Sequence, residues 1–352
     1  MRDFDNYFKE RNYKTMKKIQ GLLSELPFFC EEFFRGIENQ TTTLTRFNYA
    51  QDLKIFFNFL VTEILEFNDK KIKDITVEDL SKITATHIEI FLNYLSGYYN
   101  DDKYFSNNEK GKARKLATIR SFLKYFYKKE KISSNVSSKI ETPKIHNKEI
   151  IRLEVDEVVK LINQAESPTN FSVRQTSYNN ITKKRDVAIL SLLLGTGIRV
   201  SECVGINLDD INFEVNGFKI TRKGGNEVVL YFSDEVANTL KEYIKERNEN
   251  PKTPLDEKAL FLSLQNRRIT VRSVEKLVKK YSEASVPLKH ITPHKLRSTY
   301  GTNLYRETND IYIVADVLGH KDVNTTRKHY AAISEDSRRN VANVIKLRDK
   351  EE

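Results

Sequence analysis

The sequence predicts a mainly α-helical protein with a small antiparallel β-sheet, in which a helical N-terminal domain precedes an α+β C-terminal domain. Three observations indicate this division. Apolar residues recur at three- and four-residue intervals through roughly the first 145 residues, where glycine and proline are nearly absent. A polar segment at residues 133–150 then breaks the periodicity. Strand patterns occur only within residues 211–232 of a chain whose 352 residues suffice for two separate cores.

The N-terminal domain is predicted to span residues 1–140, and residues 141–150 are the expected linker. Threonine hydroxyls at positions 41–43 are suited to cap the first clear helix. In the last helix, apolar residues between positions 116 and 126 form one face that can be buried. The helices are expected at residues 43–64, 86–98 and 112–129, with a further one beginning at 77–80.

The second domain is predicted to comprise residues 151–352. An amphipathic helix begins at residues 153–159, and the polar stretch 167–184 is interpreted as a loop. Residues 185–194 form a strongly apolar helix that ends close to Arg199.

A β-hairpin is expected next, because Asn216-Gly217 favours the positive φ angles of a type I′ turn. A second tight turn then places Lys223 at its tip and leads into a third strand. Helical patterns resume at Asp234. The three expected strands are residues 211–215, 218–222 and 227–232.

The formal net charge of +10 and the isoelectric point of about 9.2 make nucleic acid the first partner to consider. A solvated helix face, or a composition set by an AT-rich gene, would explain the same charge. A basic helical domain ahead of a phosphate-handling one favours contact with the DNA backbone. The predicted DNA-binding residues are Thr43, Arg46, Lys112, Arg114, Lys115 and Arg120.

Other features argue against a membrane, secreted or metal-dependent protein. The apolar runs are too short to span a bilayer, and the first residues lack the apolar core of a signal peptide, so we expect a cytoplasmic location and no membrane partner. Cys30 and Cys203 are isolated and are expected to be buried, reduced thiols. His294 and His320 are far apart, without a cysteine or carboxylate cluster, so no metal or other cofactor is predicted.

Six residues of the second domain together suit chemistry on a phosphodiester. Two guanidiniums can pair with its nonbridging oxygens, and a tyrosine hydroxyl can attack phosphorus once a histidine accepts its proton. A lysine on a hairpin tip can protonate the leaving 5′ oxygen, and Glu202 can orient Arg199 or a neighbouring histidine. Each residue alone is more typical of a surface or core position, and only their joint occurrence indicates catalysis. They are Arg199, Lys223, His294, Arg297, His320 and Tyr330.

In this order the residues resemble the tyrosine recombinase (phage integrase) family, whose pattern is Arg, Lys, His-x-x-Arg, His or Trp, and Tyr. The likeness covers residues 185–332 and is greatest to the Xer group, in particular its single-recombinase, XerS-like form. Ser298 departs from the histidine of many relatives, and the interval from His320 to Tyr330 is one residue longer than in many Xer proteins. The motifs here are Gly195-Thr-Gly-Ile-Arg199, Thr221-Arg-Lys-Gly-Gly225, Thr292-Pro-His-Lys-Leu-Arg297, Leu318-Gly-His320 and Thr325-Thr-Arg-Lys-His-Tyr330.

The resemblance implies a SAM-like core-binding domain followed by a tyrosine recombinase catalytic domain, with residues 334–350 as an oligomerisation helix. It implies that Tyr330 is the nucleophile and that a 3′-phosphotyrosyl intermediate conserves the bond energy, so that neither ATP nor a metal is needed. The partners it implies are a double-stranded DNA recombination site and a homo-tetramer on two such sites.

The predicted function is therefore site-specific DNA recombination, first of all Xer-like resolution of chromosome dimers at cell division. A septal DNA translocase is suggested as an activating partner. Three alternatives stay open at this point: the integrase or excisionase of a phage or conjugative element, a type IB topoisomerase-like nicking-closing enzyme, and a DNA-binding protein that never cleaves. The last would explain the charge without requiring all six residues.

Overall fold

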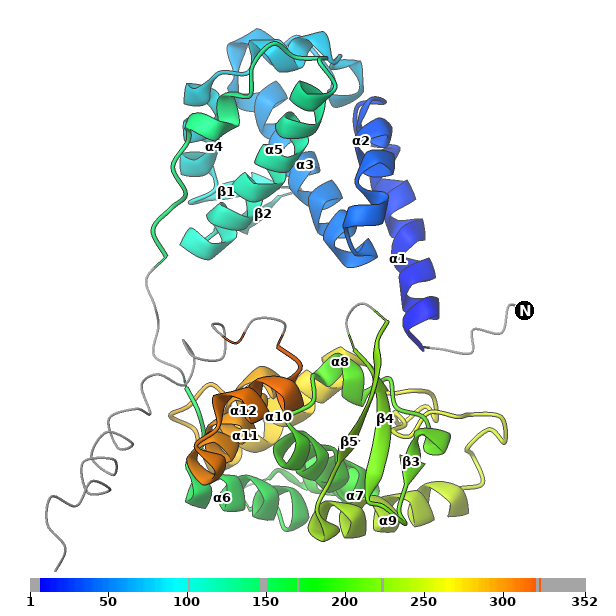
Figure 1. Ribbon diagram of the computed structural model, residues 1–352. Helices are drawn as coiled ribbons and strands as arrows, with labels where there is room; N and C mark the ends of the chain where they lie inside the picture. Colours follow the sequence, from blue (N-terminus) through cyan, green and yellow to red (C-terminus); the bar gives the residue numbers. More distant parts are fainter. Residues whose placement is uncertain are drawn as a thin grey trace, which may run out of the picture. The chain divides into compact units, whose positions relative to one another are not determined.

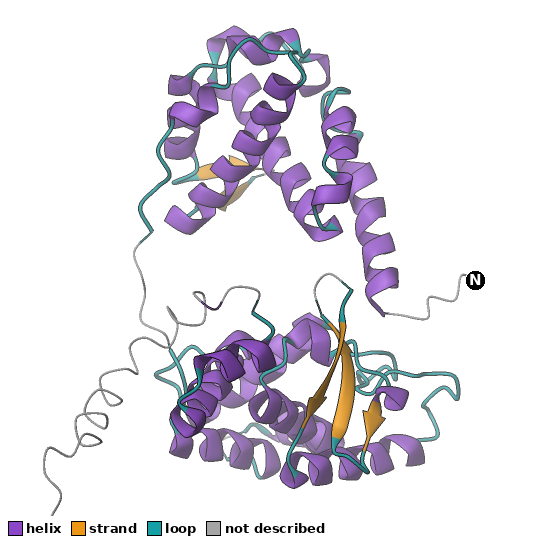
Figure 2. Cartoon of the chain, in the orientation of Figure 1, coloured by secondary structure: helices purple, strands orange, loops and turns teal. Residues whose placement is uncertain are grey.

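The computed structural model describes residues 7–100, 102–145, 151–169, 171–222, 225–320 and 323. The chain divides into two compact units, residues 1–148 and 149–352 (Figure 1). The described residues are mainly helical, with one two-stranded and one three-stranded antiparallel sheet, which confirms the predicted fold class (Figure 2).

Unit 1 is a helical bundle around an aromatic core. Phe56 of one helix packs edge-on against Phe91 of another, with ring centroids 5.1 Å apart, and Phe33 meets Phe122 in the same way. All four rings are fully buried. The helices are α1 (Tyr7–Leu23), α2 (Cys30–Gly36), α3 (Thr43–Glu63), α4 (Ala85–Tyr94) and α5 (Glu109–Lys128), with short 3₁₀ helices at Glu38–Gln40, Leu65–Phe67, Ile72–Asp74, Glu78–Lys82 and Val136–Lys139.

Side-chain caps set the helix starts of unit 1. Thr42 caps α3 by accepting a hydrogen bond from the Thr45 N–H, as the threonine run predicts. Asn108 caps α5 through the Gly111 N–H at 3.0 Å, so this helix begins before the predicted residue 112. The expected start of a helix at 77–80 is a single 3₁₀ segment instead.

The prediction of one helix over residues 86–98 was wrong beyond Tyr94. The chain leaves α4 there and forms a hairpin of β1 (Tyr98–Asn100) and β2 (Lys103–Phe105), with Asp102 at a φ of 59°. Tyr98 stacks on Tyr94 at 5.0 Å and on Phe105 at 5.7 Å. Aromatic stacking on the core thus stabilises a short hairpin that the helical spacing of the same residues conceals.

Unit 2 is built around one long helix, whose second half is buried. This helix, α7, contacts α6, α9, α10 and α11, and a three-stranded sheet in the order β3-β4-β5 completes the unit (Figure 1). The elements are α6 (Val155–Glu166), α7 (Val173–Thr196), α8 (Val200–Cys203), a 3₁₀ helix (Leu208–Asp210), β3 (Ile211–Asn212), β4 (Gly217–Thr221), β5 (Glu227–Tyr231), α9 (Asp234–Glu249), α10 (Val271–Ser285), α11 (Pro293–Thr308) and α12 (Ile311–Leu318).

The prediction of a loop at residues 167–184 was wrong, because α7 already begins at Val173. Ser172 caps it, and the Ser172 N–H in turn donates to Gln175 Oε1 at 2.8 Å. Asn179 is buried in the first half of the helix and lies against the Tyr281 hydroxyl of α10. Polar residues on the buried face are thus paired by hydrogen bonds, so the sequence shows no apolar periodicity there.

The predicted type I′ turn at Asn216-Gly217 was also wrong. Asn212 pairs with Gly217, so the loop is residues 213–216 and Gly217 already belongs to β4. Only Asn216 has a positive φ, of 48°. The expected set of three antiparallel strands is present.

Cys30 and Cys203 are both buried free thiols. Among the described helices, none has the length and apolar character that crossing a membrane requires.

Candidate active site

Four of the six predicted catalytic residues lie within the described part of unit 2. Arg199 stands where α7 gives way to α8, and His294 and Arg297 lie in the first turns of α11. His320 follows Gly319, the C-cap of α12. Lys223 and Tyr330 lie outside the described residues, as does the predicted oligomerisation helix at 334–350.

Glu202 holds Arg199 from two sides. Its Oε2 accepts the Arg199 backbone N–H at 2.8 Å, and its Oε1 accepts the guanidinium Nη1 at 2.8 Å. The glutamate is buried, whereas the side chain of Arg199 is 35% exposed. The guanidinium is therefore oriented from the protein side while part of it stays accessible to a ligand.

The left-handed residue Gly197 makes this arrangement possible. It ends α7 with a φ of 62°, a conformation that L side chains rarely adopt, and the chain then restarts as α8. Its carbonyl oxygen accepts a hydrogen bond from Arg297 Nη1 at 2.7 Å. A Cβ at this position would lie 2.3 Å from Cδ1 of Tyr300, so only glycine fits without displacement of that ring.

Arg297 is buried and bridges two helix ends. One Nη donates to Gly197 at the end of α7, and the other donates to the carbonyl oxygen of Leu318 at the end of α12. Arg199 reaches the same turn of α12, where its Nη2 donates to the Gly319 carbonyl at 3.2 Å. The two arginines, which lie far apart in sequence, thus meet at the turn that leads into His320.

The end of α12 is a defined C-cap. Gly319 has a φ of 61°, and the His320 N–H donates to Ala315 O at 2.9 Å. Two further carbonyls of this turn, of Asp316 and Val317, accept hydrogen bonds from Arg222. The carbonyl end of a helix carries a partial negative charge, so three guanidiniums are favourably bound there.

Sequence reasoning missed Arg222. It stands next to Lys223 in the Thr-Arg-Lys-Gly-Gly motif, but nothing in the sequence indicates that its side chain reaches α12.

The nearby thiol of Cys203 is no candidate nucleophile. Burial, aided by the charge of Glu202, raises its pKa to about 12, so the thiol stays protonated near neutral pH. Nor does the described part of the chain contain a group of His, Cys, Asp and Glu side chains that could hold a metal ion. Within the described residues, the predicted catalytic groups at this site are guanidinium and imidazole groups.

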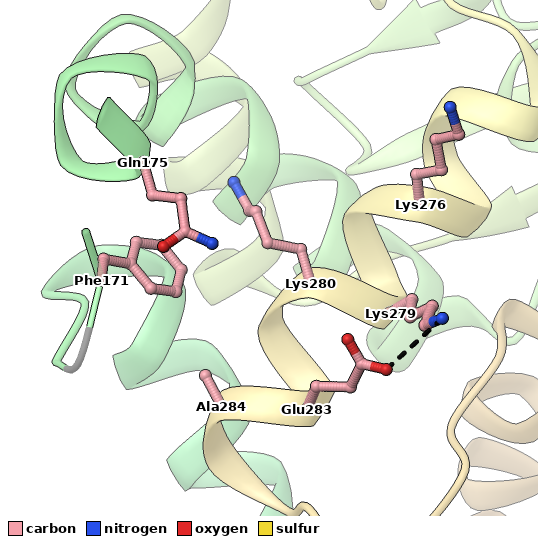
Figure 3. Close-up of a pocket in the computed structure, with 7 residues that line it drawn as sticks. All are labelled: Phe171, Gln175, Lys276, Lys279, Lys280, Glu283 and Ala284. Atoms are coloured by element: carbon pink, nitrogen blue, oxygen red, sulfur yellow. Dashed lines mark ion pairs between the residues drawn. The ribbon is translucent and has the colours of Figure 1, made fainter. Parts of the chain in front are cut away.

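A pocket of about 420 Å³ elsewhere in unit 2 contains none of the predicted catalytic residues (Figure 3). Lys279 pairs with Glu283 at 3.5 Å, and Lys280 pairs with the buried Asp186 at 3.3 Å. Its basic side chains are thus partly neutralised within the protein. The lining residues are Phe171, Gln175, Lys276, Lys279, Lys280, Glu283 and Ala284.

The residues predicted to bind DNA all lie in unit 1. Arg114 forms a two-pronged pair with the buried Asp52, with N–O distances of 2.6 and 2.7 Å, and Thr118 donates to the same carboxylate. Lys115 is buried and donates to Asn107 at 2.6 Å. Burial raises the pKa of Asp52 despite the adjacent arginine, and burial lowers the pKa of Lys115.

The other members of that set also contact their own domain. Arg120 donates to the carbonyls of Ser137 and Ile140, which fastens the segment after α5 onto that helix. Arg46 is buried and pairs with Glu38, and Lys112 donates to Ser96. Thr43 is the first residue of α3. Contact of these residues with DNA stays a prediction.

Comparisons with known proteins point to the same family as the pattern of residues in the sequence. The chain matches the phage integrase family over residues 152–336. It is 35% identical over 289 residues to tyrosine recombinase XerC of Caldanaerobacter subterraneus subsp. tengcongensis, which covers 79% of this chain and 75% of that protein. Tyrosine recombinase XerS of Streptococcus thermophilus is 29% identical over 357 residues, 94% of this chain and 98% of its own.

A likeness in fold supports the sequence matches. The crystal structure of XerH site-specific recombinase bound to its palindromic difH substrate, a post-cleavage complex, superposes with a TM-score of 0.60 at 18% identity. The match covers 87% of this chain and 81% of that one.

Proposed function

The chain belongs to the phage integrase family, and on that premise we propose that it is a site-specific tyrosine recombinase that cuts and rejoins DNA. The observation that carries this proposal is the meeting of Arg199 and Arg297 at the end of α12, next to His320. A phosphodiester repels nucleophiles through its negative charge, and two guanidiniums aimed at one phosphate reduce that charge.

Arg199 retains the donors that this role needs. A guanidinium carries five N–H groups, and within the described residues Arg199 uses one on Glu202 and one on Gly319. The remaining donors can bind the nonbridging oxygens of a phosphate. Glu202 is buried behind the guanidinium and keeps it in place when DNA is absent.

The proposed reaction transfers the phosphate from the DNA 5′ oxygen to a tyrosine and then back to DNA. The hydroxyl oxygen of Tyr330 attacks phosphorus and gives its proton to a histidine of the site, His294 or His320. The bond from phosphorus to the 5′ oxygen breaks, and Lys223 supplies the proton that this oxygen takes up. The product is a 3′-phosphotyrosyl link and a free 5′-hydroxyl. Attack by the 5′-hydroxyl of a partner duplex reverses the step and joins exchanged strands.

We further infer a Xer-like role in which four copies act on two DNA sites to resolve chromosome dimers in the cytoplasm. Supporting this are the curated relatives named XerC and XerS, the latter matched over nearly its whole length. The helical unit 1 would act as the core-binding domain, with the exposed basic side chains of α5 on the DNA backbone. A septal DNA translocase is the proposed activator of strand exchange.

A selection from random DNA tests the proposal without a known target site. Nicked duplexes of randomised sequence are incubated with the full chain in EDTA, and protein–DNA adducts that resist denaturant are collected and sequenced. We expect adducts that converge on one sequence, and far fewer of them from Arg199→Ala in the same time. A protein that binds the duplexes and forms no adduct would contradict the proposal and favour a non-cleaving DNA-binding protein.

Strand exchange separates recombination from simple nicking and closing. Two labelled duplexes that carry the selected sequence are mixed with the protein, and products are resolved under denaturing conditions. A recombinase yields molecules with exchanged arms, whereas a topoisomerase-like enzyme only relaxes supercoiled DNA.

A further inference from the structure

Arg222 connects two parts of unit 2 that each lead into a predicted catalytic residue. It follows β4, and its N–H donates to Asn226 O at 2.8 Å while its carbonyl accepts the Gly225 N–H at 3.0 Å. Its backbone therefore closes the turn between β4 and β5. The next residue in the sequence is Lys223.

The side chain of Arg222 reaches the end of α12. Its Nη1 donates to Asp316 O at 3.0 Å and its Nη2 to Val317 O at 2.8 Å. These carbonyls belong to the last turn of the helix, and the fork of the guanidinium suits two neighbouring acceptors. A lysine has one nitrogen on a flexible stem, so it cannot place two separate nitrogens on these carbonyls in a fixed planar fork.

The space around Gly319 shows how closely this guanidinium approaches the helix end. A Cβ on Gly319 would lie 2.4 Å from Nη1 and 2.6 Å from Cζ of Arg222. The guanidinium thus lies directly against the left-handed residue that precedes His320. Glycine at this position serves both the C-cap geometry and the close approach of the arginine.

The same turn of α12 also carries the two predicted catalytic arginines. Within the described residues, the carbonyls of Asp316 and Val317 bind Arg222, that of Leu318 binds Arg297, and that of Gly319 binds Arg199. Arg222 is the member of this group that comes from the β4–β5 turn. Its loss would leave the arginines on the turn but remove the link between the turn and the β-hairpin.

We propose that Arg222 is a positioning residue for DNA cleavage, which fixes the β4–β5 turn to the end of α12. This inference rests on the proposed recombinase function. Through this contact the end of α12, which leads into His320, would position the turn that carries the proposed leaving-group acid, Lys223. The acid and the histidine would then be placed on the phosphate together. Misplacement of such a group by about 1 Å is enough to cost a large factor in rate.

The test measures the rate constant of adduct formation in a single turnover, at saturating DNA, on the sequence selected above. Arg222→Ala is expected to lower this rate constant by about 10- to 100-fold, with DNA affinity and thermal midpoint close to those of the wild type. The rate constant of Arg222→Lys is expected to stay low as well, because an ammonium group keeps the charge but lacks the rigid fork of the guanidinium. The matched control is Lys219→Ala in β4, whose ion pair with Glu227 is exposed and whose charge change is identical.

A substrate with sulfur in place of the bridging 5′ oxygen supplies the decisive readout. A thiolate leaves without needing a proton, because a thiol is far more acidic than an alcohol. If Arg222 places the acid, the deficit of Arg222→Ala shrinks on this substrate. An equal deficit on both substrates, or a wild-type rate for Arg222→Ala, would overturn the inference. Absence of adduct from the wild type would instead contradict the proposed function.

Discussion

Arg199 and Arg297 donate hydrogen bonds to adjacent carbonyl oxygens at the end of α12, those of Gly319 and Leu318. The two side chains come from different helix junctions, and this shared turn brings them together. Arg297 also binds Gly197, the residue whose left-handed conformation allows the chain to present Arg199. The two arginines and the ends of α7 and α12 therefore form one connected unit.

Loss of the Arg199 guanidinium should remove cleavage and spare binding. Arg199→Ala is expected to lower the single-turnover rate of adduct formation by roughly 10²–10³-fold, the cost of one donor to a developing charge. DNA affinity, measured by fluorescence anisotropy, should change little because other basic residues remain. Arg174→Ala, an exposed arginine at the start of α7, is the control. Cleavage at the wild-type rate by Arg199→Ala would disprove its role.

Gly197→Ala should destabilise unit 2 through both backbone and packing. The left-handed φ costs about 1–3 kcal/mol for a residue with a Cβ, and the new Cβ would collide with Tyr300. Gly225→Ala is the matched control, because its φ is also positive, at 89°, and a Cβ there meets nothing within 4 Å. Urea unfolding should give the lower midpoint for Gly197→Ala. Equal midpoints for the two variants would show that the contact with Tyr300 is unimportant.

Arg114→Ala tests whether this arginine stabilises unit 1. The change leaves the buried Asp52 carboxylate without its main partner and should cost roughly 1–3 kcal/mol of unfolding free energy. Lys110→Ala, an exposed change at the start of the same helix, should cost little. Denaturant unfolding of the full chain, followed by a probe in unit 1, measures the difference. An Arg114→Ala protein as stable as the wild type but with weakened DNA affinity would instead favour the DNA-binding role.

The stability of unit 1 should depend on pH through Asp79. Burial acts to raise the pKa of this carboxyl, but hydrogen bonds from Lys70, Lys82 and the Thr76 N–H outweigh it and hold the pKa well below its ordinary value. The unfolded chain then binds the proton more readily than the folded one. The contribution of Asp79 is therefore complete at neutral pH and is lost as the pH falls below about 4.

Asp79→Asn isolates that contribution. The variant should be less stable than the wild type at pH 7, and the gap should narrow toward pH 3. The exposed Asp69→Asn is the control and should follow the wild type. If the stability of Asp79→Asn fell with acid as steeply as that of the wild type, another carboxyl would have to account for the slope.

The accuracy of the sequence prediction varied with the kind of signal. Helices with an apolar stripe, such as α3 and α5, were placed within a few residues. The start of α7 was missed because Asn179 and Thr182 are buried there with hydrogen-bond partners, Tyr281 and Asp186, rather than through apolar contact. The hairpin at Tyr98 was missed because its aromatic residues also fit a helical spacing.

In the candidate site, too, some residues could be predicted from the sequence and others could not. The order of residue types along the chain indicated Arg199, His294, Arg297 and His320, because the chemistry demands those types. No such rule identifies Arg222, whose contribution lies in a contact with backbone carbonyls. The basic residues of unit 1 pose a similar problem. Arg120 donates to a backbone carbonyl of its own domain, and the tertiary packing that brings the two together cannot be read from the sequence.

The identity of the nucleophile is the most direct test of the account. The adduct is digested with trypsin and nuclease, and the peptide that retains a nucleotide is identified by mass spectrometry. Cleavage after Lys328 and Arg338 gives a peptide whose single tyrosine is Tyr330. If Tyr330 is the nucleophile, the nucleotide is found on this peptide, attached through its 3′-phosphate, and Tyr330→Phe forms no adduct. A nucleotide on Tyr300, Tyr305 or Tyr312, or an adduct that survives Tyr330→Phe, would contradict it.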